Sequence, residues 1–214
     1  SYYRINKNSN LNITTVHDFV YEKFEKSIHK KLHIFQKKYA INNSQGIICI
    51  SESTKNDLLS YFPEIDEDNI AVIYHGVSSN FYKTDKNDEV LFINSDPSKR
   101  YIIFLGSRRG YKNFNLSIKV VKSLPKEYFL LIIGGGDLNL EEVDQLKDLS
   151  GRYSHFRDVS VEQLNSIYNF SFCLLYLSEY EGFGLPILEA QSAGCPVICQ
   201  NTSSIPEVYG STEN

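Results

Sequence analysis

Residues 178–190 read SEYEGFGLPILEA, and GCPVI follows at residues 194–198. Glycines such as Gly182 and Gly184 allow positive φ angles and a close approach of the backbone to a ligand. Pro186 suits the first turn of a helix, where its missing N–H is no loss. Because the free N–H groups of that turn and the helix dipole can hold a phosphate, the stretch predicts an anion-binding loop that leads into a helix.

Charged side chains accompany this loop in two places. Glu181 lies in the loop and Glu189 about one turn into the helix, so both carboxylates can accept hydrogen bonds from sugar or ribose hydroxyls. Arg108, Arg109 and Lys112 follow an earlier apolar run, where positive charge would stabilise a departing diphosphate. We therefore expect an anion site whose acidic residues also bind hydroxyl groups.

The second half of the chain alternates between continuous apolar runs and amphipathic segments. We expect strands at residues 101–105, 128–133, 172–176 and 197–199, and helices at residues 115–124, 140–149, 161–168 and 186–193. This alternation indicates a parallel sheet that is covered on both faces. Ligands bind such sheets beyond the carboxyl ends of the strands, and three candidate segments follow strands: Gly106–Asn113, Gly134–Gly136 and Glu181–Pro186.

The first half shows the same pattern in fewer steps. We expect strands at residues 11–16, 46–51 and 70–74, and His17 follows the first of them. A helix is predicted to run to Tyr61 from Ser51 or Ser53, either of which can cap it. Residues 78–100 are polar and acidic, and we place a linker at 81–100. It would separate a partial amino-terminal domain (1–80) from a second domain (101–214).

One more helix is predicted from Tyr21 to Ala40, with two different faces. Its apolar residues recur at three- and four-residue spacing: Phe24, Ile28, Leu32 and Phe35. The other face carries Lys23, Lys26, Lys30, Lys31, Lys37 and Lys38. We expect these lysines to form a solvated face. The alternative is docking to an anionic membrane surface.

Composition and charge narrow the class of protein. A hydrophobic content of 42% and a charged content of 22% are typical of a globular chain. The formal net charge of -4 creates no general attraction for nucleic acid, so we expect no nucleic-acid partner. No apolar run approaches the ~20 residues that cross a bilayer, and the first ten residues lack the apolar centre of a signal peptide. We expect a cytoplasmic protein.

Four cysteines occur, and Cys49, Cys173 and Cys199 lie in apolar runs that predict buried, reduced thiols. Cys195 and Cys199 flank Pro196, but no second Cys or His pair is near enough in sequence to complete a zinc site. We therefore expect no metal. The chain contains no methionine, so we also expect it to be part of a longer protein.

The loop and helix at residues 178–198 resemble the E-x7-E signature of family-4 glycosyltransferases of GT-B fold. Other segments resemble that family in the same order, so the resemblance covers essentially the whole chain: Ser51–Asp57, His75–Val77, Gly106 with Lys112–Asn113, Gly134–Gly136 and Ser203–Val208. It implies an α/β fold in which a Rossmann-like parallel sheet forms the GT-B carboxyl-terminal domain and a partial Rossmann-like domain precedes it. The family's other acceptor-side strands would precede Ser1, and its closing helix would follow Asn214.

The resemblance also implies a role for each candidate residue. Glu189 would hold the ribose hydroxyls, and Glu181 with the backbone of Gly182, Phe183, Gly184 and Leu185 would meet the donor sugar and phosphates. Lys112 and Arg108, beside Gly106, would bind the diphosphate, and His17 would contact the donor sugar. The backbone at residues 157–160 would receive the base. Tyr111 and Ser107 stand where many relatives carry basic residues, which leaves the choice between Arg108 and Arg109 open.

The implied function is transfer of a sugar, with retention of configuration, from a nucleotide-diphosphate-sugar donor to a glycan or lipid-linked acceptor. The resemblance implies bacterial polysaccharide or lipid-linked glycan synthesis at the inner face of the membrane, with no cofactor and no metal. Asp66-Glu67-Asp68 has the D-x-D shape of metal-dependent transferases, but we expect a solvated turn there. The alternative function is a non-catalytic nucleotide-binding module. An NAD-dependent oxidoreductase is disfavoured because residues 134–139 lack the last glycine of the dinucleotide motif.

Overall fold

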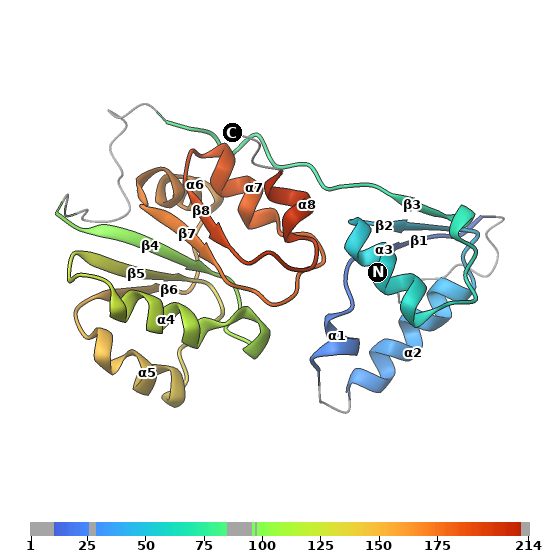
Figure 1. Cartoon of the computed structure of the whole chain (residues 1–214), viewed down its shortest axis with the longest axis horizontal. Helices are drawn as coiled ribbons and strands as arrows, with labels where there is room; N and C mark the ends of the chain where they lie inside the picture. The colour runs from blue at the N-terminus through green and yellow to red at the C-terminus, as the bar shows by residue number, and fades with distance from the viewer. Residues whose placement is uncertain (1–10, 26–28, 85–95, 97, 211–214) are drawn as a thin grey trace. The chain divides into compact units, whose positions relative to one another are not determined.

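The computed structural model describes residues 11–25, 29–84, 96 and 98–210 (Figure 1). These residues form two compact units. The first contains the chain up to Gly76 together with two later segments, Tyr180–Gly184 and the residues from Thr202 onward. The second contains Val77–Glu179 and Leu185–Asn201. Each unit has its own parallel sheet.

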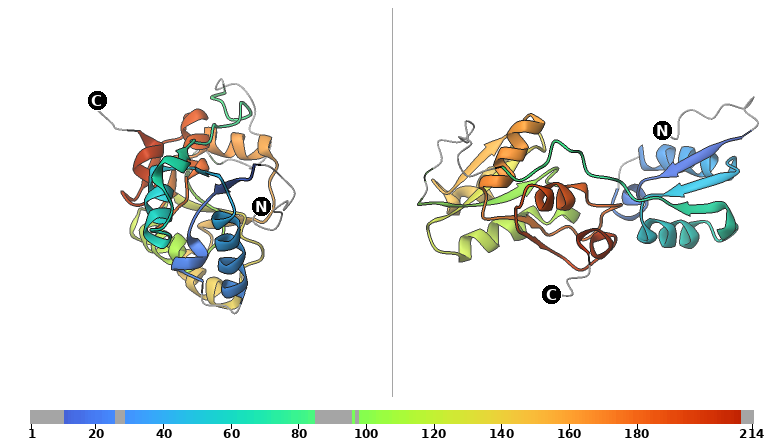
Figure 2. Two further views of the ribbon diagram at one scale, coloured as in Figure 1. Left: turned by 90° about the vertical axis from the view of Figure 1, so that its right-hand side faces the viewer. Right: turned by 90° about the horizontal axis from the view of Figure 1, so that it is seen from above.

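The first unit is built on a three-stranded sheet in the order β1-β2-β3. Its elements are β1 (Ile13–Val16), α1 (Val20–Lys23), α2 (His29–Asn42), β2 (Gly46–Cys49), α3 (Glu52–Tyr61), the 3-10 turn Glu67–Asn69, β3 (Ile70–Val72) and α8 (Ile205–Tyr209). Helices α2 and α3 lie on the same face of this sheet (Figures 1 and 2). Ile41 and Leu58 on these helices pack against Val16, Ile47 and Cys49.

The second unit is a doubly wound sheet in the order β6-β5-β4-β7-β8. Its elements are β4 (Arg100–Leu105), the 3-10 turn Gly110–Lys112, α4 (Phe114–Ser123), β5 (Tyr128–Ile133), α5 (Leu140–Leu146), the 3-10 turn Lys147–Leu149, β6 (Tyr153–Phe156), α6 (Val161–Phe170), β7 (Cys173–Tyr176), α7 (Leu185–Ser192) and β8 (Val197–Cys199). Helices α4 and α5 cover one face, and α6 and α7 cover the other (Figure 1).

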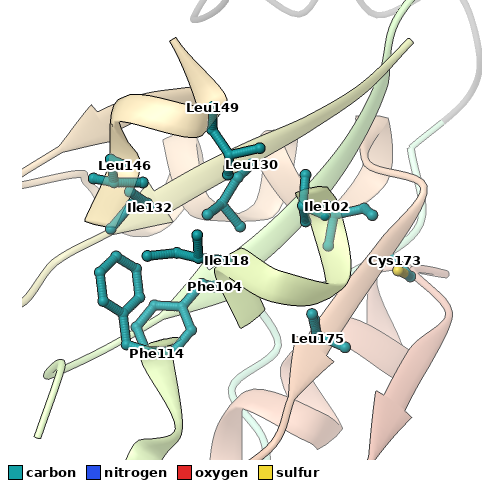
Figure 3. Close-up of a cluster of buried hydrophobic side chains, with 11 residues drawn as sticks. Ile102, Phe104, Phe114, Ile118, Leu130, Ile132, Leu146, Leu149, Cys173 and Leu175 are labelled. Carbon is teal, nitrogen blue, oxygen red and sulfur yellow. The ribbon is translucent and has the colours of Figure 1, made fainter. Parts of the chain in front are cut away.

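The two faces of this sheet explain the continuous apolar strands. Ile102, Leu130 and Cys173 stand side by side in register and face α4 and α5. They belong to the cluster of buried hydrophobic side chains shown in Figure 3. The intervening residues Ile103 and Leu131 are equally buried on the opposite face. Burial on both sides of the strands confirms the predicted parallel sheet. Strand order reverses between β4 and β7, the kind of position where such sheets bind ligands.

The predicted helix from Tyr21 to Ala40 is wrong in its continuity and in its faces. Helix α1 ends at Lys23, and α2 begins only at His29. Leu32 and Phe35 are 58% and 66% exposed, whereas Lys37 is 1% exposed. The buried side of α2 carries Lys37, Ala40 and Ile41 instead, and Lys37 can lie there because its ammonium pairs with the Glu22 carboxylate. Part of the expected pattern, at Lys26 and Ile28, lies outside the described residues.

Two elements had not been predicted, β6 and α8. Strand β6 reads Tyr-Ser-His-Phe and lies at the edge of its sheet, where partial exposure removes the apolar run that marks the inner strands. Helix α8 has only five residues. Asp66 does form the expected turn, with its side chain accepting a hydrogen bond from the Asp68 backbone N–H. The linker lies largely outside the described residues, so the boundaries 1–80, 81–100 and 101–214 remain a prediction.

Candidate active site

The loop Tyr180–Gly184 belongs to the first unit, where side chains from two elements satisfy its backbone carbonyls. Ser51, the N-cap of α3, donates its hydroxyl to the Gly182 carbonyl at 2.8 Å, and Thr54 donates to the same oxygen at 3.1 Å. The Ser203 hydroxyl donates to the Glu181 carbonyl at 2.6 Å. The hydroxyl of Ser204 lies 2.9 Å from the carbonyls of both Glu181 and Phe183. Four hydroxyls therefore fix the backbone course of the loop.

Gly182 is required by close packing against the segment that follows β1. A Cβ at this position would lie 1.9 Å from the carbonyl oxygen of His17 and 2.9 Å from the Cβ of Asp18. The φ angle of Gly182 is not positive, so the expected reason for this glycine is corrected from backbone angle to space. Gly184 does have a positive φ of 111°, as the sequence suggested.

Tyr180 connects the loop to three parts of the first unit. Its hydroxyl accepts a hydrogen bond from the Phe19 backbone N–H at 2.9 Å and donates to Asp57 at 2.8 Å. The Lys23 ammonium lies 2.6 Å from the same carboxylate and 4.5 Å from the centre of the Tyr180 ring. Burial, and then the charge of Asp57, raise the pKa of Tyr180 far above its usual range, so the hydroxyl stays protonated.

His17 lies directly beside this loop. Its ring is stacked with that of His75, with centroids 6.1 Å apart, and the rings of His75 and Phe183 are nearly perpendicular, with centroids 5.4 Å apart. Burial, and then the neighbouring His75, lower the pKa of His17. The imidazole is therefore neutral at neutral pH. The structure brings together five of the predicted site residues in the first unit: His17, Glu181, Gly182, Phe183 and Gly184.

Glu189 lies in the second unit, on the helix α7 that begins at Leu185. The Tyr168 hydroxyl donates a hydrogen bond to one of its carboxylate oxygens at 3.2 Å. Burial raises the pKa of Glu189, and the hydrogen bond from Tyr168 opposes this in part. The carboxylate is half-buried and retains acceptor capacity for a hydroxyl donor.

Arg108 holds the glycine loop that follows β5. Its Nη atoms donate to the carbonyls of Gly134, Gly135, Gly136 and Asp137 at 2.8 to 3.2 Å. The three glycines have φ angles of 80°, 78° and 73°, which directs their carbonyls toward the guanidinium. A Cβ on Gly135 would lie 2.4 Å from an Arg108 nitrogen, so this glycine run serves the arginine. The Nε atom of Arg108 also lies 2.9 Å from a carboxylate oxygen of Glu142, but the two atoms do not have hydrogen-bond geometry.

A cavity of about 310 Å³ adjoins this arginine in the second unit. Its lining includes Arg108, Arg109, Asn115, Glu141 and Gln145. The Arg108 side chain is only 3% exposed, whereas Arg109 is exposed. Of the two arginines that the sequence left open, Arg109 is the one whose side chain is accessible to an added anion.

Lys112 and Asn113 lie between the carboxyl ends of β4 and β7. The Lys112 ammonium lies 5.4 Å from the centre of the Tyr176 ring and 5.6 Å from that of Tyr111. Asn113 adopts a left-handed conformation with a φ of 54° and donates its side-chain amide to the Leu177 carbonyl at 3.0 Å. Gly106, with a φ of 104°, directly follows β4. These contacts place Lys112 where the strand order reverses.

Two models of glycosyltransferase families match this chain. Residues 85–214 match the model for "Glycosyl transferases group 1", and residues 9–81 match that for "Glycosyltransferase Family 4". The chain belongs to the group 1 glycosyltransferase family.

Two similar curated proteins are also glycosyltransferases by name. This group 1 glycosyltransferase chain is 26% identical to O-antigen chain mannosyltransferase RfbU of Salmonella typhimurium over 91% of its own length. It is 28% identical to O-antigen chain mannosyltransferase B of Escherichia coli over 87% of its length. The alignments cover 53% and 49% of those proteins, so the chain spans about half the length of each.

Solved structures show that this family member has the GT-B fold. Sucrose-phosphate synthase from Thermosynechococcus elongatus matches with a TM-score of 0.76 and 20% identity, over 91% of this chain and 51% of that one. WaaG, a glycosyltransferase involved in lipopolysaccharide biosynthesis, matches with a TM-score of 0.72 and 17% identity, over 94% and 60%. Anabaena HepE in complex with UDP and glucose matches with a TM-score of 0.68 and 18% identity, over 90% and 53%.

Several residues that shape this candidate site have no individual role in the prediction from sequence, although Thr54, Ser203 and Ser204 lie in segments that resemble the family. Tyr180 contacts Phe19 and Thr54 contacts Gly182 across 161 and 128 residues of chain, whereas Ser203 and Ser204 bind carbonyls 22 and 21 residues away. A local signal existed for Ser51 alone, because a serine before a helix predicts a cap. Among the described residues, no group of three or more His, Cys, Asp or Glu side chains is placed to hold a metal ion.

Proposed function

We propose that this chain forms the donor-binding part of a retaining glycosyltransferase that uses a nucleotide-diphosphate-sugar. The observation that carries the proposal is the loop Tyr180–Gly184, whose backbone is fixed by four hydroxyls and packed against His17. A loop with a fixed backbone course that leads into helix α7 suits a diphosphate, because the free N–H groups of the first helical turn can hold a phosphate. A preorganised dipole also stabilises the negative charge that develops on departure of the diphosphate.

Each side chain has a distinct task in this proposal. Glu189 accepts hydrogen bonds from the ribose hydroxyls, and its protonation state responds to the burial that raises its pKa. Lys112 and Arg109 neutralise the diphosphate, while Arg108 supports the Gly134–Asp137 loop and only indirectly the donor. Neutral His17 offers a ring nitrogen to a hydroxyl of the donor sugar, and the Glu181 carboxylate faces the same ligand. No metal or other cofactor is needed in this scheme.

Relatives support a narrower substrate class. The two curated proteins described above are named as O-antigen chain mannosyltransferases, and HepE was solved with UDP and glucose. We infer that the substrate is a hexose carried on a nucleoside diphosphate and that the acceptor is a growing glycan or a lipid-linked glycan of a bacterial polysaccharide. Synthesis would take place in the cytoplasm, at the inner face of the membrane.

Membrane association in this scheme is peripheral. No helix in the described part of the chain is both long and apolar enough to span a bilayer. Helix α2, however, exposes Leu32 and Phe35 three positions apart, with exposed lysines Lys31 and Lys38 beside them. An apolar stripe flanked by lysines suits the interface of an anionic membrane, where a lipid-linked acceptor resides.

Binding and transfer are tested separately. A thermal-shift panel of nucleoside diphosphates on this chain tests binding, because a ligand at about 100 times its dissociation constant stabilises a fold by roughly 2.7 kcal/mol. Release of nucleoside diphosphate from candidate donors, measured with and without acceptor, tests transfer. Binding with no turnover in the protein at its full natural length would favour the alternative, a non-catalytic nucleotide-binding module.

A further inference from the structure

Lys37 is buried deep in the first unit. Among the residues that the structure describes, it is the one charged residue buried as a whole, with a side chain that is 1% exposed. Its ammonium donates to the Glu22 carboxylate at 2.8 Å, and the Glu22 side chain is itself 5% exposed. The ammonium also lies 4.5 Å from the centre of the Phe19 ring.

Stability alone does not explain why this ion pair is present. Removing two charges from water costs about as much as their attraction returns, so apolar residues of similar size are often as stable or more stable. The ammonium does, however, make one contact that no apolar side chain could replace. It donates a hydrogen bond to the backbone carbonyl of Asp18 at 2.8 Å.

That carbonyl belongs to the residue directly after His17. The segment His17–Phe19 is held at three successive points: the His17 carbonyl packs against Gly182, the Asp18 carbonyl accepts from Lys37, and the Phe19 N–H donates to Tyr180. Gly182 and Tyr180 belong to the loop Tyr180–Gly184, the candidate donor loop. Lys37 is the one contact of the three that approaches from helix α2.

We propose that the buried Lys37–Glu22 pair positions His17 against the donor loop. This inference rests on the proposed function, in which His17 contacts the donor sugar. Lys37 is a positioning residue, since its ammonium holds a backbone carbonyl and reaches no ligand. A misplacement of about 1 Å in a reacting geometry costs on the order of a hundredfold in rate, so loss of this anchor should appear in kcat.

The test uses three variants. Lys37→Met breaks the pair, Glu22→Leu with Lys37→Met replaces it by an apolar pair, and Lys38→Met makes the same substitution at the exposed neighbouring position. Unfolding midpoints, nucleoside diphosphate affinity and sugar transfer are measured for each, with transfer measured in the protein at its full natural length. We expect Lys37→Met to lower both the unfolding midpoint and kcat, and Lys38→Met to leave the unfolding midpoint unchanged.

The double variant separates positioning from stability. We expect it to recover the unfolding midpoint of the wild type, to keep nucleoside diphosphate affinity within about twofold, and still to lose about tenfold or more in kcat. Recovery of kcat together with the unfolding midpoint would overturn the inference, because the pair would then serve folding alone.

Hydrogen exchange gives a readout that does not depend on the proposed reaction. The Phe19 amide donates to Tyr180 in the same segment, so its exchange should accelerate in both variants that lack Lys37 and stay unchanged in Lys38→Met. Unchanged protection of Phe19 in the double variant would also overturn the inference. If the wild type transferred no sugar, the proposed function would fail, while the exchange experiment would still decide whether Lys37 anchors the segment.

Discussion

Gly182 is required because the structure leaves no space for a Cβ atom at this position. We predict that Gly182→Ala lowers the free energy of unfolding by about 1–3 kcal/mol, the usual cost of forcing extra atoms into a packed site. The added methyl group would meet the His17 carbonyl, which is backbone and cannot rotate away. Urea unfolding measures the effect. Gly110→Ala is the matched control, because nothing lies within 4 Å of a Cβ at Gly110 and its φ is not positive.

An equal effect of the two glycine substitutions on stability would show that the approach of the donor loop to His17 is looser than the geometry indicates. A donor loop displaced by the alanine should also bind nucleoside diphosphate more weakly than the Gly110→Ala protein does.

Glu189 combines a cost in stability with a proposed role in binding. Burial raises its pKa, so the folded state binds more protons than the unfolded state between the ordinary glutamate pKa and the raised one. The free energy of unfolding should therefore fall as the pH rises through that window. We predict that Glu189→Gln lacks this fall, because glutamine keeps the contact with Tyr168 and cannot ionise.

The same substitution should weaken binding. Loss of a charge-assisted hydrogen bond to ribose costs about 1.5–3 kcal/mol, which corresponds to at least tenfold in dissociation constant. Chemical unfolding across the pH range and calorimetric titration with nucleoside diphosphate measure the two effects. A Glu189→Gln protein that bound as tightly as the wild type would remove Glu189 from the site.

At the scale of elements, the two arginines after β4 differ in role: Arg108 binds the loop that follows β5, whereas Arg109 is exposed. We predict that Arg108→Met lowers the free energy of unfolding by about 2 kcal/mol or more, since four backbone carbonyls lose their donor. Arg109→Met should change stability by less than about 0.5 kcal/mol, as exposed substitutions usually do. It should instead weaken diphosphate binding. The reverse assignment, with Arg109 stabilising and Arg108 binding, would refute this account of the cavity.

Helix α2 provides a second prediction at this scale. Anionic vesicles should sediment the protein at low salt, and the charge reversals Lys31→Glu and Lys38→Glu together should reduce that binding, since each lysine near an anionic surface contributes about 1 kcal/mol. Neutral vesicles and high salt serve as controls. If anionic vesicles bind the protein no better than neutral ones, the exposed Leu32 and Phe35 do not form a membrane surface.

The elements of the second unit could be predicted well because their signal is local. Strands such as Tyr128–Ile133 are buried on both faces, so a continuous apolar run marks them without knowledge of any partner. Helix α2 could not be predicted in the same way. Its buried side includes Lys37. This lysine can be buried because its ammonium donates to the Glu22 carboxylate and the Asp18 carbonyl, two contacts that a local sequence pattern does not reveal.

In the candidate site, too, features with a local sequence signal could be predicted, and features that depend on distant contacts could not. Residues 178–190 carry a pattern that predicts the candidate donor loop, and Gly184 has the positive φ that its residue type suggests. The reason for Gly182 could not be predicted, since the His17 carbonyl that it meets is distant in sequence. Arg108 likewise had the charge of a ligand-binding residue, whereas its position behind three left-handed glycines made it a support for the loop.

For the whole molecule, the two units differ in the size of their sheets. The second unit has a five-stranded sheet covered on both faces, whereas the described part of the first has three strands with α2 and α3 on one face. We therefore predict that this 214-residue chain binds nucleoside diphosphate but does not transfer sugar. Multiple-turnover transfer by the chain alone, followed with a labelled donor, would contradict the second part of that prediction.

Isothermal titration of this chain with UDP and with GDP tests most directly whether it binds a nucleoside diphosphate. We predict saturable binding of at least one of them at one site per chain and weaker binding of the matching monophosphate. The Lys112→Ala protein should further lose about 1.5–3 kcal/mol of binding free energy. Absence of measurable heat with either diphosphate, in a chain shown to be folded by its cooperative unfolding, would contradict the predicted binding.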